Sequence, residues 1–210
     1  MVNCLIHQIT GPKANQFING CLNSWDKLKS NGFIRVIWTD ESIEQFLITN
    51  YSFALDAFKK ARNHGEAADI ARYLILHFFG GYYVDWDIEL IRPDLFLQLH
   101  SEFPNGYLLI DPKTDALSSE HFSCLKNEEY LLKLCEDIVF TYERGERDLM
   151  DTQHFSGPDR MRVALKRHPI CKQQIIPIKD VFEYDFWEIR KMDGRSPTKP
   201  MIHYWLHTWM

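Results

Sequence analysis

The stretch GGYYVDWD, residues 80–87, decides the fold of this chain. Its aromatic residues and valine after two glycines predict a strand over residues 82–90. A helix over about residues 66–79 is expected just before it, because apolar residues recur there at helical spacing. Gly80 and Gly81 are typical of the residues that end a helix. Helix, glycine turn and strand together predict one α/β unit.

Strand and helix patterns alternate on both sides of this unit. Further strands are predicted at residues 5–9, 33–38, 106–111 and 175–178. Helices are predicted at about residues 14–30, 41–48, 51–62, 127–143 and 158–167. The mostly apolar strand at 33–38 is expected to be covered on both faces. The alternation predicts an α/β fold with a central sheet of mainly parallel strands, flanked by crossover helices.

Composition narrows the class of protein. The chain has 210 residues, enough for one sizeable α/β domain. A net charge of -5 argues against the basic face that nucleic-acid binding requires. Five cysteines without metal-ligand spacing indicate free thiols in a reducing compartment. With no signal-like N-terminus and no transmembrane segment in the pattern, we expect a cytoplasmic protein.

Asp85 and Asp87 are the first candidate site residues. On a strand their side chains would emerge on the same side, about 7 Å apart. Two carboxylates that close repel each other unless a cation or proton lies between them. Oxygen ligands suit Mg²⁺ or Mn²⁺, and the end of an apolar strand is where open α/β sheets bind ligands. The bare D-x-D tripeptide also occurs as an ordinary polar strand end, so the flanking residues carry much of this interpretation.

Asp69 and Arg72 lie three residues apart and therefore share one face of the predicted helix. On a protein surface such a pair would be an ion pair worth less than about 1 kcal/mol. Their neighbours are almost all apolar, so this helix is expected to be largely buried, where a charged pair is costly unless it has partners. A functional role for the pair is the second interpretation.

With these residues in view, the segments AADIARY (67–73) and GGYYVDWD (80–87) resemble the DXD-motif sugar transferases. That family includes bacterial capsular-polysaccharide enzymes, the yeast initiating mannosyltransferase and the catalytic domains of large clostridial glucosylating toxins. Weaker similarities touch the opening strand, the first helix, a late helix start and the C-terminal segment, at residues 6–9, 24–25, 157–158 and 203–209.

The resemblance implies a GT-A fold, that is, a Rossmann-like nucleotide-diphospho-sugar transferase. The whole chain, residues 1–210, would form one catalytic domain, on its own or within a longer protein. The implied catalytic residues are Asp69, Arg72, Asp85 and Asp87. The implied donor-binding residues are His7, Gln8, Ile9, Tyr83, Trp86, Thr208 and Trp209. The metal, Mn²⁺ or Mg²⁺, would be held by Asp85, Asp87 and His207, with His203 as the alternative histidine.

The implied reaction is the metal-dependent transfer of a hexose from a nucleotide-diphosphate sugar to a glycan or glycoprotein. A UDP-sugar is favoured over GDP-mannose, and retention of anomeric configuration is expected because the similar enzymes mostly retain it. No free carboxylate stands out as a base, and acceptor contacts are expected from the middle of the chain, around Asp111, Phe122 and residues 145–156. A bacterial cytoplasm or that of a virus-infected host fits these features.

Two other functions compete with this one. A D-x-D phosphohydrolase would need a threonine or valine two residues after the second aspartate and a later G-D-x-x-x-D loop. Here Asp87 is followed by Ile88 and Glu89, and the loop is missing from the sequence. A non-catalytic module that binds carbohydrate or metal ranks third, because the set of Asp69, Arg72, Asp85 and Asp87 is intact.

Overall fold

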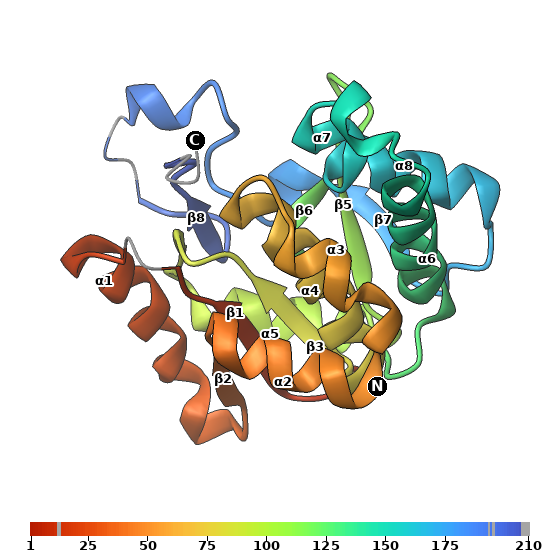
Figure 1. Cartoon of the computed structure of the whole chain (residues 1–210). Coiled ribbons are helices and arrows are strands. Elements are labelled where there is room, and N and C mark those ends of the chain that lie inside the picture. The colour runs from red at the N-terminus through yellow and green to blue at the C-terminus, as the bar shows by residue number, and fades with distance from the viewer. Residues whose placement is uncertain (12–13, 193, 195, 207–210) are drawn as a thin grey trace.

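A six-stranded sheet forms the centre of the molecule in the computed structural model, which describes residues 1–11, 14–192, 194 and 196–206 (Figure 1). The strand order is β2-β1-β3-β6-β5-β7. The strands are β1 (Leu5–Ile9), β2 (Ile34–Trp38), β3 (Gly81–Val84), β5 (Tyr107–Asp111), β6 (Ala116–Cys124) and β7 (Gln174–Pro177). All run parallel to one another except β6, which is antiparallel to both neighbours. The predicted mainly parallel α/β sheet is confirmed.

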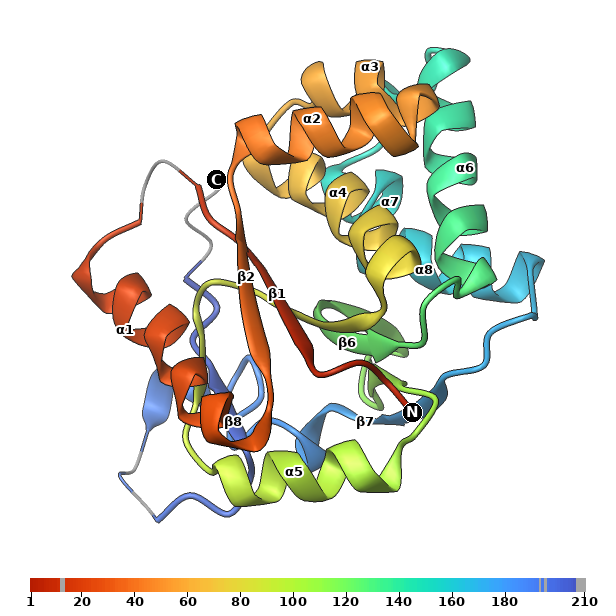
Figure 2. The same ribbon diagram turned by 90° about the horizontal axis from the view of Figure 1, so that it is seen from below.

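Helices cover both faces of this sheet (Figure 2). The α-helices are α1 (Gln16–Ser24), α2 (Asp40–Asn50), α3 (Leu55–Lys59), α4 (His64–Phe79), α5 (Pro93–Glu102), α6 (Glu129–Glu143), α7 (Thr152–Phe155) and α8 (Pro158–Arg167). One apolar core lies between the sheet and helices α2, α3, α4, α6 and α8. A second core lies on the other face, beneath α5 and the 3₁₀ turn Trp25–Asn31. None of the described helices combines the length and apolar character needed to cross a membrane.

The prediction of one strand over residues 82–90 is wrong. Strand β3 ends at Val84, and β4 (Ile88–Leu90) belongs to a separate two-stranded sheet with β8 (Met201–His203). The N–H of Asp85 still donates to the carbonyl of Glu120 on β6, at 2.9 Å, and the chain then turns as Ile88 N–H bonds back to the Asp85 carbonyl, at 3.1 Å. Residues 85–87 therefore form the turn between two sheets, where strand periodicity does not apply.

Two further predictions need correction. Strand β2 is an edge strand, so Ile34 and Ile37 are 61% and 39% exposed instead of covered on both faces. The helix predicted over residues 14–30 is divided into α1 and a 3₁₀ turn that begins at Trp25. Phe17 on α1 is 48% exposed and packs edge-on against the ring of Tyr204.

Strand β6 and helix α5 were not predicted. The sequence of β6, ALSSEHFSC, mixes polar and apolar residues without alternation, yet most of its side chains are buried. Only the pairing with β3 and β5 makes it a central strand. Helix α5 begins at Pro93, a residue that the sequence had marked as the end of a strand.

The turn from α4 into β3 positions residues 80–87 in space. The side chain of Asn63 caps α4 by accepting from Glu66 N–H, and Gly80 and Gly81 end it with φ values of 67° and 102°. A Cβ atom on Gly81 would lie 2.6 Å from the carbonyl oxygen of Leu5. The chain therefore enters the sheet centre directly after α4, and the side chains of α4 lie above the end of β3.

Replacing Gly81 by Ala is expected to destabilise the fold by about 2–5 kcal/mol, because the substitution combines a positive φ with a backbone clash. Gly20→Ala is the matched control: Gly20 lies in α1 with nothing within 4 Å of the added Cβ. The control is expected to be neutral or to add about 0.5–1 kcal/mol. Urea unfolding of both variants measures this, and equal stabilities would contradict the role given to the glycine turn.

Candidate active site

A pocket opens where β1 and β3 end. Its walls come from Ile9 at the end of β1, from α4, from the turn at residues 85–87, from β6, from residues 152–158 and from the C-terminal segment. Open parallel sheets bind ligands at this edge because the strand ends and following turns leave a crevice there. The pocket contains most of the residues that the sequence marked as candidates.

Asp85, Asp87 and His203 form a compact set of ligand-type side chains in this pocket. One ligand atom from each lies within 4.8 Å of the others, closer than the separation expected on a strand. The turn after Val84 brings the two carboxylates together, and β8 adds the histidine from more than a hundred residues away. Among the described residues, this is the group of histidine, cysteine and acidic side chains with the geometry to hold a metal ion.

The charges in this set are coupled. His203 Nε2 lies 3.4 Å from an Asp87 carboxylate oxygen, and both side chains are almost fully buried. Burial favours the uncharged form of each, but the attraction between them outweighs it, so the pKa of Asp87 is lowered and that of His203 is raised. A hydrogen bond from Leu206 N–H, at 2.9 Å, adds to the stabilisation of the Asp87 carboxylate.

Arg72 lies between Asp69 and Asp85. Its guanidinium nitrogens are 3.5 Å from a carboxylate oxygen of each, and all three side chains lie in the pocket wall. The guanidinium also donates to the carbonyl of Ser119 at 2.6 Å and lies 4.5 Å from the ring centre of Tyr83. Burial nevertheless raises the pKa of both carboxyl groups to about 6, although Arg72 opposes that shift. The pair at 69 and 72 is therefore a buried, partnered pair, as the apolar helix predicted.

The C-terminal segment is tied to the same turn. The N–H of Tyr204 donates to the backbone carbonyl of Asp87 at 3.1 Å, and the phenol of Tyr204 donates to Glu89 at 2.6 Å. Trp205 adopts a φ of 46°, stacks against His203 with ring centres 4.1 Å apart and lines the pocket. His207, Thr208 and Trp209 lie outside the described residues, so their expected roles stay predictions.

The three candidate residues on β1, namely His7, Gln8 and Ile9, differ in their position relative to the pocket. His7 accepts from the Trp38 indole and donates to the Gly80 carbonyl, both at 3.1 Å, so its ring supports the glycine turn. Gln8 is fully buried, and of these three residues only Ile9 lines the pocket. Tyr83 and Trp86 line it as well, with the Tyr83 phenol donating to Asp85 at 2.6 Å.

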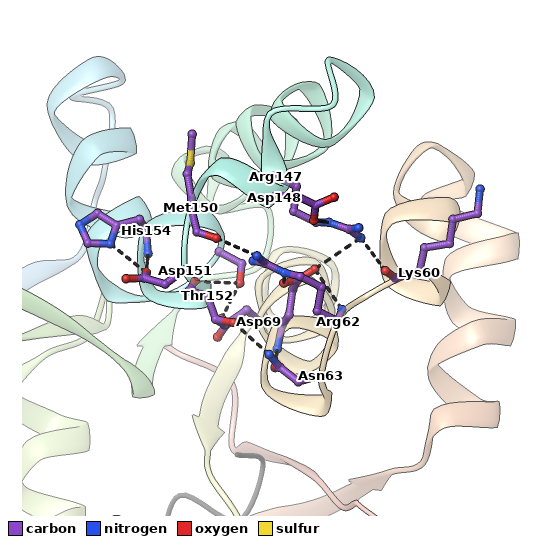
Figure 3. Close-up of polar contacts among 12 residues, drawn as sticks. Lys60, Arg62, Asn63, Asp69, Arg147, Asp148, Met150, Asp151, Thr152 and His154 are labelled. Carbon is purple, nitrogen blue, oxygen red and sulfur yellow. Dashed lines mark hydrogen bonds and ion pairs between the residues drawn. The ribbon is translucent and has the colours of Figure 1, made fainter.

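Polar contacts join the pocket wall around residues 150–157 to α4 and to the residues just before it (Figure 3). Arg62 donates to the carbonyl of Met150 at 2.7 Å, and the amide of Asn63 donates to the Thr152 hydroxyl at 3.0 Å. Farther along, the hydroxyl of Ser156 donates to Asp69 at 2.8 Å. Thr152 and Gln153 of the expected acceptor loop line the pocket, and an acceptor role for this loop stays a prediction. The same expectation is wrong for Phe122, which is fully buried in the core, and Asp111 does not line the pocket.

Several pocket residues were not among the sequence candidates, and the one with an ionisable carboxylate is Glu120. Glu120 comes from β6, the strand that the sequence did not predict, and it lines the pocket beside Ser119. Glu120 lies beside Asp85 because β6 pairs with the end of β3. That pairing joins segments far apart in the sequence, so the sequence alone could not reveal the position of Glu120.

Comparison with known proteins finds a family resemblance in one part of the chain. Residues 16–103 match the family described as the glycosyltransferase sugar-binding region containing DXD motif. That range contains α4, Asp85 and Asp87. The match covers less than half of the chain, so it shows that this segment is similar to the DXD-motif glycosyltransferases.

The chain is also similar to curated fungal proteins. It is 40% identical over 63 residues to inositol phosphoceramide mannosyltransferase 1 of Schizosaccharomyces pombe, covering 30% of this chain and 20% of the relative. It is also 40% identical over 52 residues to mannosyl phosphorylinositol ceramide synthase SUR1 of Saccharomyces cerevisiae, covering 25% of this chain and 14% of the relative. The chain thus spans about a fifth or less of these relatives.

The similarity of folds extends further than that of sequences. PaToxG glycosyltransferase superposes with a TM-score of 0.59 at 18% identity, covering 80% of this chain and 70% of that one. At this low identity the similarity concerns the fold alone, and it confirms the predicted GT-A fold.

Replacing Arg72 by Ala is expected to lower the free energy of unfolding by about 3–5 kcal/mol at pH 7, because two buried carboxylates lose their counter-ion. The loss should be smaller at pH 5. Without the guanidinium, the pKa of Asp69 and of Asp85 would rise above about 6, and a carboxyl group with a raised folded-state pKa destabilises the fold only where it is ionised.

Urea unfolding at the two pH values measures the difference. Arg162→Ala is the control, since Arg162 pairs with Asp115 and Asp159 on the surface and should change stability by less than about 1 kcal/mol at either pH. An Arg72→Ala loss that is the same at pH 5 and pH 7 would contradict the buried ion-pair account.

Proposed function

We propose that this chain catalyses metal-dependent transfer of a hexose from a nucleotide-diphosphate donor to a glycan or glycoprotein acceptor. The observation that carries the proposal is the shared pocket: Asp85, Asp87 and His203 lie in the same pocket as the Asp69–Arg72 pair. A metal-binding set next to a buried pair of hydrogen-bonding charges suits a ligand that has both a diphosphate and a sugar.

The residues present fit a divalent cation. Two carboxylates and one imidazole offer oxygen and nitrogen ligands, a set compatible with Mn²⁺ and, through its oxygens, with Mg²⁺. His203 Nδ1 is buried without a hydrogen-bond partner among the described residues, so this nitrogen has unused bonding capacity in the pocket. We propose His203 as the third ligand, with His207 as the alternative.

The chemistry needs negative charge on the departing diphosphate to be neutralised, and a bound divalent ion supplies that as a Lewis acid. The chain's own residues position the reactants. Asp69 and Arg72 are fixed by Ser156, Ser119 and Asp85, so their remaining hydrogen-bonding capacity is held in place for sugar hydroxyls. Binding energy is thereby converted into alignment of the reacting bond.

The donor proposal includes two nucleotide sugars. A UDP-hexose follows from the resemblance to glucosylating toxins, whereas the names of the fungal relatives support a mannosyl donor such as GDP-mannose. Retention of anomeric configuration and a cytoplasmic site of action belong to the same proposal. A thermal-shift comparison of UDP-glucose and GDP-mannose, each with and without Mn²⁺, separates the donors, since a bound donor raises the melting temperature by mass action.

Asp87→Asn is expected to lower metal-dependent donor turnover at least about 100-fold while leaving the fold intact, because the amide is a weaker and uncharged ligand. Asp94→Asn is the control, an exposed aspartate on α5 paired with Arg92. Turnover is measured as release of nucleoside diphosphate with increasing Mn²⁺. Full turnover in Asp87→Asn would refute the assignment of the site.

His203→Ala and His207→Ala form a matched pair that identifies the third ligand. His203→Ala is expected to weaken Mn²⁺ binding about 10- to 100-fold, and His207→Ala to leave it within a few-fold of wild type. Titration calorimetry with Mn²⁺ and the nucleoside diphosphate measures both, and circular dichroism checks that the buried His203 can be removed without unfolding. The reverse order would transfer the ligand role to His207.

A further inference from the structure

Glu120 is the pocket carboxylate for which the proposed function gives no role. It lies on β6, directly beside the metal-binding turn, because its backbone carbonyl accepts from the N–H of Asp85. Phe122, two residues along the strand and therefore on the same face, packs in the core beneath α4. The Glu120 side chain consequently lies on the α4 side of the sheet, where it lines the pocket with Asp69 and Arg72.

The electrostatic surroundings of Glu120 differ from those of the other three carboxylates. Asp69 and Asp85 share the cation Arg72, and Asp87 pairs with His203. Within residues 1–11, 14–192, 194 and 196–206, no lysine, arginine or histidine forms an ion pair with Glu120. Glu120 still acts electrostatically on another carboxylate of the pocket. Burial is the main cause of the raised pKa of Asp69, and the negative charge of Glu120 adds to that shift.

One of its two oxygens is held in place. The hydroxyl of Ser118, a residue that is only 5% exposed, donates a short hydrogen bond to Oε2. In the described part of the chain, Oε1 has no hydrogen-bond partner. Glu120 therefore presents a fixed, ionisable acceptor to the pocket, with one oxygen free for a ligand.

The chemistry of the ligand follows from this arrangement. The set of Asp85, Asp87 and His203 already provides a place for the diphosphate, and a phosphate oxygen placed against the Glu120 carboxylate itself would be repelled by it. A neutral hydroxyl is the complementary group, because it donates to a carboxylate in a charge-assisted hydrogen bond. Sugars carry several such hydroxyls at fixed angles to one another.

We propose that the Glu120 carboxylate binds a hydroxyl group of a sugar in this pocket, with Ser118 as its positioning residue. The proposal rests on the proposed function, and the sugar belongs to the donor or to the acceptor. Glu120 then helps to determine which sugar is accepted, since an analogue that lacks this hydroxyl leaves the carboxylate buried against the substrate without a partner.

Binding measurements test whether Glu120 binds a hydroxyl of the donor sugar. The affinities of the nucleoside diphosphate alone and of the nucleotide sugar are compared in Mn²⁺, for wild type, Glu120→Ala and Glu120→Gln. In wild type the nucleotide sugar should bind more tightly than the nucleoside diphosphate. This ratio of affinities should fall about 10- to 100-fold in Glu120→Ala, because a hydrogen bond to a charged group is lost. The affinity of the nucleoside diphosphate alone should not change. Glu120→Gln keeps an acceptor oxygen without the charge and should lose less.

Kinetics of sugar transfer test whether Glu120 binds a hydroxyl of the acceptor sugar. If the hydroxyl belongs to the acceptor, donor binding is unchanged in Glu120→Ala and the KM for the acceptor rises by a similar factor. Ser118→Ala should reproduce either effect to a smaller extent. Glu102→Gln, an exposed carboxylate at the end of α5, is the control and should match wild type.

Two results would overturn the proposal. Glu120→Ala with wild-type donor binding and a wild-type acceptor KM would show that no hydroxyl is bound there. A kcat that falls equally in Glu120→Ala and Glu120→Gln at unchanged KM would instead make Glu120 a proton acceptor. The proposed function itself would be wrong if the wild-type protein bound neither nucleoside diphosphate nor nucleotide sugar in Mn²⁺. That outcome is seen in the wild type, so it can be distinguished from the two results above, which concern the Glu120 variants.

Discussion

The ion pairs of Arg72 with Asp69 and Asp85 constrain the rest of the site. Taking three charges out of water is costly, and the cost is offset only when each charge has close partners. The guanidinium therefore has to lie against the carbonyl of Ser119 and the Tyr83 ring as well as between the two carboxylates. These contacts join α4, β3 and β6 into one rigid wall. A sugar that binds there meets groups whose positions are already fixed.

The second constraint is the turn between the two sheets. Residues 85–87 leave the central sheet at Asp85 and enter the small sheet at Ile88, so both aspartates lie where β8 and the C-terminal segment can reach them. His203, Tyr204 and Leu206 all contact Asp87. The proposed metal-ligand set is thus assembled from the middle and the C-terminal part of the chain, and pairing of β4 with β8 is what brings them together. Glu120 on β6 completes the pocket from a third direction.

Local patterns were enough for much of the fold. Helix α8 begins and ends where its proline and its apolar spacing predict, and the Gly80–Gly81 ending of α4 follows from the need for positive φ. Both are decided by residues close in sequence. Strand β6 and the edge position of β2 could not be predicted in this way, because pairing with distant strands determines whether a mixed polar segment is buried or an apolar one exposed.

By itself the sequence determined the α/β class, the helix that carries Asp69 and Arg72, and the choice of Asp85 and Asp87 as metal-type carboxylates. These depend on residue chemistry and on spacing within a single helix or a single short motif. Only the tertiary structure decided that the aspartates lie in a turn, that His203 stands beside Asp87, and that Glu120 faces the same pocket. Those contacts join residues separated by about 30 to more than 100 positions, and no local periodicity encodes which of many distant side chains the folded sheet brings within a few ångströms.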